Sequence, residues 1–194
     1  MFSGIRIMTF CFRIMKTIEE QGYTFHEWLK PDQIASDVQQ VADRISADYK
    51  DKEPLFVIVL NGAFVFAADL IRALKDVRCE QTFIRVSSYY GMASTGRLEF
   101  IVPLQQVVEN RDVIIVEDII DSGLTIHQLK AHLRGLGATS VRVATMLFKP
   151  HKLEFDDAKP DYVGREISDE FVIGYGLDFD GFLRNLPSIY KVKE

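Results

Sequence analysis

The run Leu55-Phe-Val-Ile-Val-Leu60 is continuously apolar and ends at Asn61-Gly62. An unbroken apolar run is typical of a strand that is covered on both faces, because a strand with one wet face alternates apolar and polar residues. Residues 81–90 return to β-branched and aromatic types. Between them, apolar residues recur at helical spacing, at Phe64, Ala67, Ala68, Ile71 and Leu74. A strand, a helix and a second strand in this order predict a βαβ unit.

The same alternation extends in both directions from this unit. Upstream, residues 34–45 carry apolar positions at helical spacing after Pro31 and Asp32, which suit a helix start. Downstream, the pattern predicts a strand at 113–116, a helix at 124–136 and a strand at 141–148. Parallel strands need crossover connections, so this order predicts an α/β fold with a mainly parallel, twisted sheet flanked by helices.

Two segments depart from the alternation. Residues 91–96, Gly-Met-Ala-Ser-Thr-Gly, are small and polar and lie between strand-like segments, which predicts a hairpin with a flexible loop at 88–102. Residues 157–190 are rich in aromatic residues and glycine, which predicts short strands and loops. We expect them to form a small hood, built from terminal segments, over the sheet. The chain is thus predicted to be one domain over 19–194 after an N-terminal extension at 1–18.

Composition limits the functions that this chain can have. Among 194 residues there are 23 Lys+Arg and 28 Asp+Glu, and the net charge of -5 provides no basic face for a nucleic acid. No apolar run approaches the ~20 residues that a membrane-spanning helix needs. Cys11 and Cys79 lack metal-ligand spacing and fit reduced thiols in the cytoplasm. Translation could start at Met8 or Met15, so we expect a dispensable extension or a disordered tail rather than a targeting signal.

The segment Val116-Glu-Asp-Ile-Ile-Asp-Ser-Gly-Leu-Thr125 joins the predicted 113–116 strand to the next helix. Ligands of open α/β sheets lie outside the carboxyl ends of strands, and a helix N-terminus offers unpaired N–H groups to an anion. Gly123 lets the backbone approach a ligand closely, and the hydroxyls of Ser122 and Thr125 can donate to phosphate oxygens. The sequence therefore predicts a phosphate cradle formed by Ser122, Gly123, Leu124 and Thr125.

Three acids precede this cradle. Glu117 and Asp118 are expected to end the strand, and Asp121 follows three residues later. Neighbouring carboxylates resist burial unless a cation or hydroxyl donors satisfy them. Asp121 and Ser122 could also serve only as helix caps. Three acids beside a phosphate-type turn favour a site for ribose hydroxyls, Mg²⁺ and a 5′-phosphate.

This segment resembles the phosphoribosyl-pyrophosphate signature of type I phosphoribosyltransferases. Further segments resemble the hypoxanthine (hypoxanthine-guanine) branch of that family, in the family's order over residues 20–189: Leu60-Asn61-Gly62, Ser88-Tyr89 with Ser94-Thr95-Gly96, Lys149, Phe171-Val172, and Leu177-Asp178 through Arg184. The resemblance implies purine salvage, in which N9 of a 6-oxopurine displaces pyrophosphate from phosphoribosyl pyrophosphate to give IMP or GMP. It also implies Mg²⁺ as cofactor and assembly into a homodimer or homotetramer.

The resemblance further implies a role for each matching residue. Asp121 is the expected general base, and Ser122 to Thr125 hold the 5′-phosphate. Glu117 and Asp118 hold the ribose hydroxyls and, with Asp178, are the expected Mg²⁺ ligands. Pyrophosphate is expected to contact Asn61, Gly62 and Arg184, and Asn61 stands where some relatives have lysine. The base is expected to contact Lys149, Phe171 and Val172, under a closing loop that carries Ser88 and Tyr89.

Two other functions stay open. The chain could be a phosphoribosyltransferase for xanthine or another base. It could also be a non-catalytic regulator that senses phosphoribosyl pyrophosphate and binds nucleic acid. The sequence has no basic run for nucleic acid, and it carries the acidic, phosphate and base groups together, which favours the enzyme.

Overall fold

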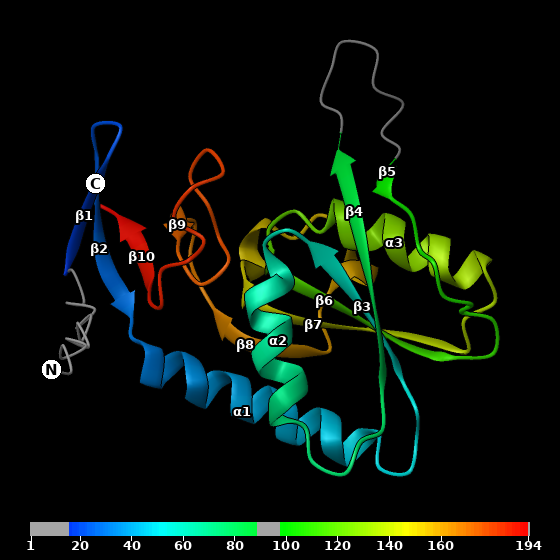
Figure 1. Cartoon of the computed structure of the whole chain (residues 1–194). Coiled ribbons are helices and arrows are strands. Elements are labelled where there is room, and N and C mark those ends of the chain that lie inside the picture. The colour runs from blue at the N-terminus through cyan, green and yellow to red at the C-terminus, as the bar shows by residue number, and fades with distance from the viewer. Residues whose placement is uncertain (1–15, 89–97, 194) are drawn as a thin grey trace, which may run out of the picture.

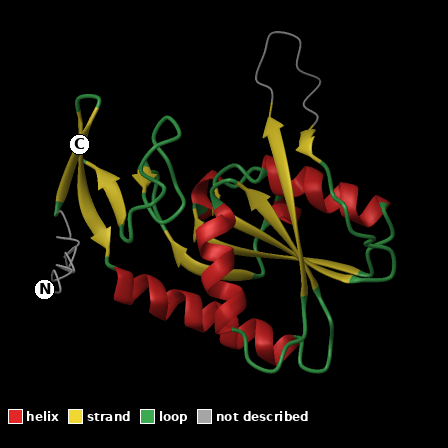
Figure 2. Cartoon of the chain, in the orientation of Figure 1, coloured by secondary structure: helices red, strands yellow, loops and turns green. Residues whose placement is uncertain are grey.

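The computed structural model describes residues 16–88 and 98–193, which form two sheets with flanking helices (Figures 1 and 2). The larger sheet has the strand order β5-β4-β3-β6-β7-β8. Strands β3, β4, β6, β7 and β8 pair in parallel, whereas β5 pairs with β4 antiparallel. This arrangement confirms the predicted α/β fold. The bounds are β3 Leu55–Leu60, β4 Glu80–Ser88, β5 Leu98–Val102, β6 Asp112–Ile120, β7 Ser140–Phe148 and β8 Tyr162–Glu166.

Helices cover both faces of this sheet. They are α1 (Pro31–Asp48), α2 (Ala63–Ala73) and α3 (Leu124–Gly135), and two short 3₁₀ turns follow β7, η1 (Pro150–Lys152) and η2 (Asp156–Ala158). Pro31 begins α1, where its missing N–H costs nothing. The Gln33 side chain accepts a hydrogen bond from the Lys30 N–H at 3.1 Å, which caps the start of α1. In the described part of the chain, no helix has both the length and the apolar character to cross a membrane.

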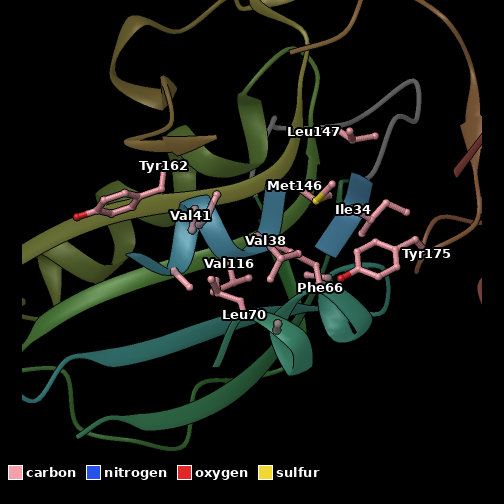
Figure 3. Close-up of a cluster of buried hydrophobic side chains, with 14 of the residues drawn as sticks. Ile34, Val38, Val41, Phe66, Leu70, Val116, Met146, Leu147, Tyr162 and Tyr175 are labelled. Carbon is pink, nitrogen blue, oxygen red and sulfur yellow. The ribbon is translucent and has the colours of Figure 1, made fainter. Parts of the chain in front are cut away.

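Alternate residues of the central strands enter two separate cores. Phe56 and Ile58 pack with the buried sides of α1 and α2, in the cluster that Figure 3 shows around Val116. Leu55 and Val57 point to the opposite face and pack with the buried side of α3. Both faces of β3 are thus buried, which explains why its sequence is apolar throughout.

The smaller sheet is the hood and brings both ends of the described chain together. Its strands are antiparallel in the order β1-β2-β10-β9, and Figure 1 shows them at the left of the molecule. Their bounds are β1 Thr17–Glu20, β2 Tyr23–Leu29, β9 Val172–Ile173 and β10 Ile189–Val192. The hood has its own small core of Phe25, Ile173 and Tyr190.

Several boundaries differ from those expected from the sequence. Strand β6 continues to Ile120 because β7 pairs with it along its length, so Glu117 and Asp118 lie inside the strand rather than at its end. Residues 162–166, assigned above to the hood, form the edge strand β8 of the larger sheet. Residues 17 and 18, assigned above to the extension, lie in β1. Residues 1–15, Tyr89 and Ser94-Thr95-Gly96 lie outside the described residues.

Candidate active site

A pocket of about 330 Å³ opens at the carboxyl ends of β3 and β6. This is the edge at which open parallel sheets bind ligands, since loops from neighbouring strands diverge there. The pocket is formed by the turn after β3, the end of β6, the loop into α3 and residues 174–188 between β9 and β10, which we call the hood loop. The lining residues that the sequence singled out are Gly62, Glu117, Asp118, Asp121, Ser122, Gly123, Leu124, Thr125, Asp178 and Arg184.

The loop into α3 has the geometry of an anion site. Gly123 is the N-cap of α3 and has a φ of 82°, in the left-handed region. A Cβ at Gly123 would lie 2.7 Å from Leu153 Cδ1 and 2.8 Å from Ala158 Cβ, so the loop is packed tightly from behind. Gly123 has no side chain to cap the helix, and the Leu124 N–H donates to Ser122 Oγ at 3.4 Å. The N–H groups of the first turn, at Leu124, Thr125 and Ile126, belong to residues that line the pocket. These groups and the partial positive charge of the helix end suit a phosphate.

Glu117 and Asp118 form a half-buried acidic pair in this pocket. Glu117 Oε2 is buried and has no hydrogen-bond partner. Burial raises the pKa of Glu117 well above its usual 4.5, and the adjacent Asp118 carboxyl raises it further. Burial also raises the pKa of Asp118, although the Arg184 guanidinium opposes the shift. Hydroxyl donors or a bound cation close to Glu117 would therefore favour its ionised form.

The turn after β3 meets this acidic pair. The peptide bond between Leu60 and Asn61 is cis. Gly62 lines the pocket, whereas the exposed Asn61 is not among the residues that line it. The turn also packs against the hood loop, since a Cβ on Gly176 would lie 2.2 Å from the Gly62 carbonyl oxygen.

Asp178 and Arg184 lie at the mouth of the pocket on the hood loop. Arg184 Nη2 lies 2.8 Å from Asp178 Oδ1, and Arg184 Nη1 donates to the Gly176 carbonyl oxygen at 2.7 Å. Asp178 Oδ2 accepts a hydrogen bond from the Gly181 N–H at 2.7 Å. These contacts hold Arg184, which is expected to bind pyrophosphate, beside Asp178, which is an expected Mg²⁺ ligand.

A second pocket of about 250 Å³ adjoins the first and shares Asp118, Asp121 and Asp178 with it. Lys149, Glu170, Phe171 and Val172 also line it. Phe171 is 48% exposed, which is unusual for an aromatic residue that has packed neighbours and leaves ring surface for a ligand. Lys149 is 6% exposed, so a buried ammonium is available to a ligand in this pocket.

Lys149 is already paired in the structure. Its Nζ lies 3.5 Å from Asp121 Oδ2 and 3.3 Å from Asp169 Oδ1. Lys152 contacts the same two aspartates. The sequence analysis missed Lys152, Asp169 and Glu170. The three-residue spacing of Lys149 and Lys152 after β7 was an available signal for a cationic pair, but their acidic partners come from distant segments.

The structure thus gathers nearly all of the sequence-predicted residues around two adjoining pockets. Ser88 lies at the end of β4 without a described side chain, and Tyr89 lies outside the described residues. Across residues 16–88 and 98–193, no three His, Cys, Asp or Glu side chains gather closely enough to hold a metal by themselves. Mg²⁺ usually binds through one or two carboxylates together with substrate phosphates and water, so this acidic pair fits Mg²⁺ that arrives with a phosphorylated substrate.

Comparison with known proteins defines the class. Residues 28–180 match the family model described as a phosphoribosyl transferase domain, and the chain belongs to this family. The hypoxanthine-guanine phosphoribosyltransferase of Bacillus subtilis is 41% identical over 166 residues, which cover 85% of this chain and 91% of that protein. The hypoxanthine-guanine-xanthine phosphoribosyltransferase of Tritrichomonas foetus is 39% identical and covers 84% of this chain and 88% of its own.

A solved structure agrees with these relatives. The crystal structure of a hypoxanthine phosphoribosyltransferase from Staphylococcus aureus superposes with a TM-score of 0.82 at 36% identity, over 87% of this chain and 91% of that one. Within the family, the chain is a transferase of the purine-salvage branch. The alternative of a non-catalytic regulator is therefore set aside.

Proposed function

We propose that this protein transfers the 5-phosphoribosyl group of phosphoribosyl pyrophosphate to hypoxanthine or guanine. The bond from C1 of the ribose to the pyrophosphate oxygen breaks, and a bond from C1 to purine N9 forms. The products are IMP or GMP and pyrophosphate. The observation that carries this proposal is the shared wall of the two pockets, where Asp118, Asp121 and Asp178 separate a phosphate cradle from a cavity lined by Lys149 and Phe171.

The first pocket suits the sugar phosphate. The start of α3, from Ser122 to Thr125, binds the 5′-phosphate through backbone N–H groups and hydroxyls. Glu117 and Asp118 accept hydrogen bonds from the ribose hydroxyls, which gives the buried Glu117 Oε2 the donor that it lacks. Arg184 and the backbone of the turn at Gly62 bind pyrophosphate, with Asn61 in the same turn. Ser88 and Tyr89 close over the reactants.

The transition state carries positive charge on the ribose and negative charge on the leaving group. Glu117 and Asp118 stabilise the former, and Arg184 stabilises the latter. When bound, Mg²⁺ would neutralise charge on pyrophosphate, held by one or two of the carboxylates of Glu117, Asp118 and Asp178 together with phosphate oxygens and water. Asp121 accepts the proton that the purine ring releases as the new bond forms.

The second pocket selects the base. An ammonium only donates, so Lys149 hydrogen-bonds a 6-oxo group but would meet the 6-amino group of adenine donor to donor. Phe171 stacks on the ring, and the Val172 backbone pairs with the ring edge. Adenine is therefore expected to be a poor substrate. We further propose that the protein works in the cytoplasm, since its free Cys79 suits a reducing compartment. We also propose a homodimer or homotetramer, as the family resemblance implies.

The proposal is tested by supplying phosphoribosyl pyrophosphate and Mg²⁺ with hypoxanthine, guanine, xanthine, adenine or uracil and identifying the products. We expect IMP and GMP to form fastest, and a preference for uracil would contradict the base site. Asp121→Asn should lower kcat by about 10²-fold or more, the usual contribution of a general base. Asp51→Asn is the matched control, because Asp51 is exposed and lies outside both pockets. Full turnover in Asp121→Asn would overturn the role of Asp121.

Xanthine is the second candidate base, and the name of the Tritrichomonas foetus relative includes it. The base pocket is lined by one cation, Lys149, and by the carboxylates Asp118, Asp121, Glu170 and Asp178. Xanthine loses a proton more readily than hypoxanthine, and an anionic base is disfavoured beside these carboxylates. We expect xanthine to be a weaker substrate whose turnover falls further as pH rises. Xanthine turnover equal to that of hypoxanthine at alkaline pH would instead make xanthine a principal substrate.

A further inference from the structure

Four charged side chains of alternating sign meet beside the base pocket. Besides the contacts of Lys149 given above, Lys152 Nζ lies 2.7 Å from Asp169 Oδ1 and 3.7 Å from Asp121 Oδ1. Each lysine contacts both aspartates, so the four formal charges sum to zero. Asp121 comes from the loop after β6, the lysines from the end of β7 and η1, and Asp169 from the segment before β9.

The proposed function uses Lys149 and Asp121 but gives no role to Lys152 or Asp169. Lys149 has to turn its buried ammonium toward a 6-oxo group when a base binds. Without Lys152, a single ammonium would face two carboxylates, and either of them would compete with the base for it. A second cation must therefore pair with the carboxylates of Asp121 and Asp169 before Lys149 is free to bind the base.

Lys152 has the contacts to supply this pairing. It lies closer to Asp169 than Lys149 does, at 2.7 Å against 3.3 Å. Its hydrogen bond is the largest cause of the lowered pKa of the Asp169 carboxyl. The Lys152 side chain is 39% exposed, against 8% for that of Lys149. Lys152 can therefore neutralise Asp169 from the solvent side while Lys149 faces the pocket.

We propose that Lys152 is a positioning residue for base binding, which neutralises Asp169 and Asp121 so that Lys149 is free to bind the 6-oxo group. This inference rests on the proposed function. Lys152 acts through Lys149 and does not line the base pocket. Its backbone N–H donates to the Lys149 carbonyl oxygen at 3.1 Å, and Pro150 lies within the same turn. The turn therefore keeps its own support when the Lys152 side chain is removed.

The test compares Lys152→Met with Lys152→Arg and with the control Lys159→Met. Lys159 is exposed, lies in the same connection between β7 and β8, and is outside the four-residue charge cluster. In Lys152→Met we expect KM for hypoxanthine to rise about tenfold, as when a hydrogen bond to a charged group is weakened. We expect kcat and KM for phosphoribosyl pyrophosphate to stay near their wild-type values. Lys152→Arg and Lys159→Met should resemble the wild type.

The double variant Lys152→Met with Asp169→Asn separates positioning from a structural role. Removing the charge of Asp169 removes the need for Lys152, so the double variant should recover most of the wild-type KM for hypoxanthine. Two purely structural losses would instead add. The inference is overturned if Lys152→Met leaves KM for hypoxanthine unchanged, raises KM for both substrates equally, or is not rescued. A wild-type protein without turnover of any 6-oxopurine would overturn the proposed function as well, which distinguishes the two failures.

Discussion

The backbone of Gly62 lies directly against the carboxylate of Asp118. A Cβ built on Gly62 would fall 1.5 Å from Asp118 Oδ2 and 2.5 Å from its Cγ. Gly62 follows β3 and Asp118 lies in β6, and these strands pair in parallel. The contact therefore joins the proposed pyrophosphate turn to the acidic pair, with no space for a side chain between them.

Gly62→Ala should disable the site without unfolding the protein. The new methyl group has to displace either the turn or the Asp118 carboxylate, and a displacement of about 1 Å in a catalytic site can cost about 10²-fold in rate. We expect kcat/KM for phosphoribosyl pyrophosphate to fall by about that factor, measured in steady-state assays. Gly135→Ala is the matched control, because no atom lies within 4 Å of a Cβ at that helical position. Unchanged kinetics in Gly62→Ala would show that the turn does not act with Asp118.

Glu117 should make the stability of the ligand-free protein depend on pH. Its pKa is raised well above 4.5 in the folded state, so the folded protein retains a proton that the unfolded chain loses. Stability contributed by this proton is present at low pH and is lost as pH rises through the folded pKa. In Glu117→Gln we therefore expect Tm to fall less between about pH 5 and about pH 8 than in the wild type.

Thermal unfolding without substrate or Mg²⁺, followed at several pH values, measures this difference. The raised pKa of Asp118 acts in the same direction, so Glu117→Gln should reduce the dependence rather than abolish it. Parallel Tm profiles of the two proteins would contradict the assignment of a raised pKa to Glu117.

The ion pair of Arg165 and Asp37 ties β8 to α1 and should contribute to stability alone. Arg165 Nε donates to Asp37 Oδ2 and Nη2 donates to Oδ1, both at 2.7 Å. Asp37 is 4% exposed, whereas the Arg165 side chain is 36% exposed. Arg165→Met leaves a buried carboxylate unpaired and should cost about 3 kcal/mol of unfolding free energy. Asp37→Asn should cost less, because Arg165 can still reach water.

Urea unfolding measures both free energies. Turnover should stay at the wild-type level in each folded variant, since this pair lies outside both pockets. The opposite order of stability, with Asp37→Asn the more damaging, would contradict the argument from burial.

The order of apolar and polar residues along the chain predicted the elements whose burial it determines, such as β3 and α1. The uniform apolar run of β3 predicted burial on both faces, and the helical spacing from Ile34 to Ile45 predicted the buried side of α1. Strand β8 was missed because Tyr162-Val-Gly-Arg-Glu166 has neither an apolar run nor a clean alternation. Strand β8 belongs to the larger sheet because its backbone pairs with β7, and the composition of residues 162–166 does not predict this pairing.

The same limit applies to the candidate site. Glu117 and Asp118 were expected at a strand end because charged residues usually end buried strands. Pairing with β7 carries β6 past them, so that both lie half-buried inside the strand. Asp169 lies 48 residues from Asp121 in the sequence, so that only the folded chain brings it to the lysines. The single segment from Glu117 to Thr125 was recognised because its acids, glycine and hydroxyls are contiguous.

Phe179 should control base binding through Phe171. The two rings lie 5.8 Å apart between centroids at 82°, an edge-to-face contact behind the ring that lines the base pocket. Phe25, which is fully buried, contacts both rings and fixes the group in the hood. Such contacts contribute about 1 kcal/mol beyond buried area, so Phe179→Leu should raise KM for hypoxanthine about fivefold.

Steady-state assays with each substrate varied in turn test this role. KM for phosphoribosyl pyrophosphate should stay unchanged in Phe179→Leu, because Phe179 does not line the phosphate pocket. Phe179→Tyr keeps the ring and should restore KM for hypoxanthine. Phe182→Leu is the matched control, since Phe182 is 68% exposed and lines neither pocket. If Phe179→Leu and Phe182→Leu raise KM for hypoxanthine equally, the support that Phe171 needs comes from Phe25 alone.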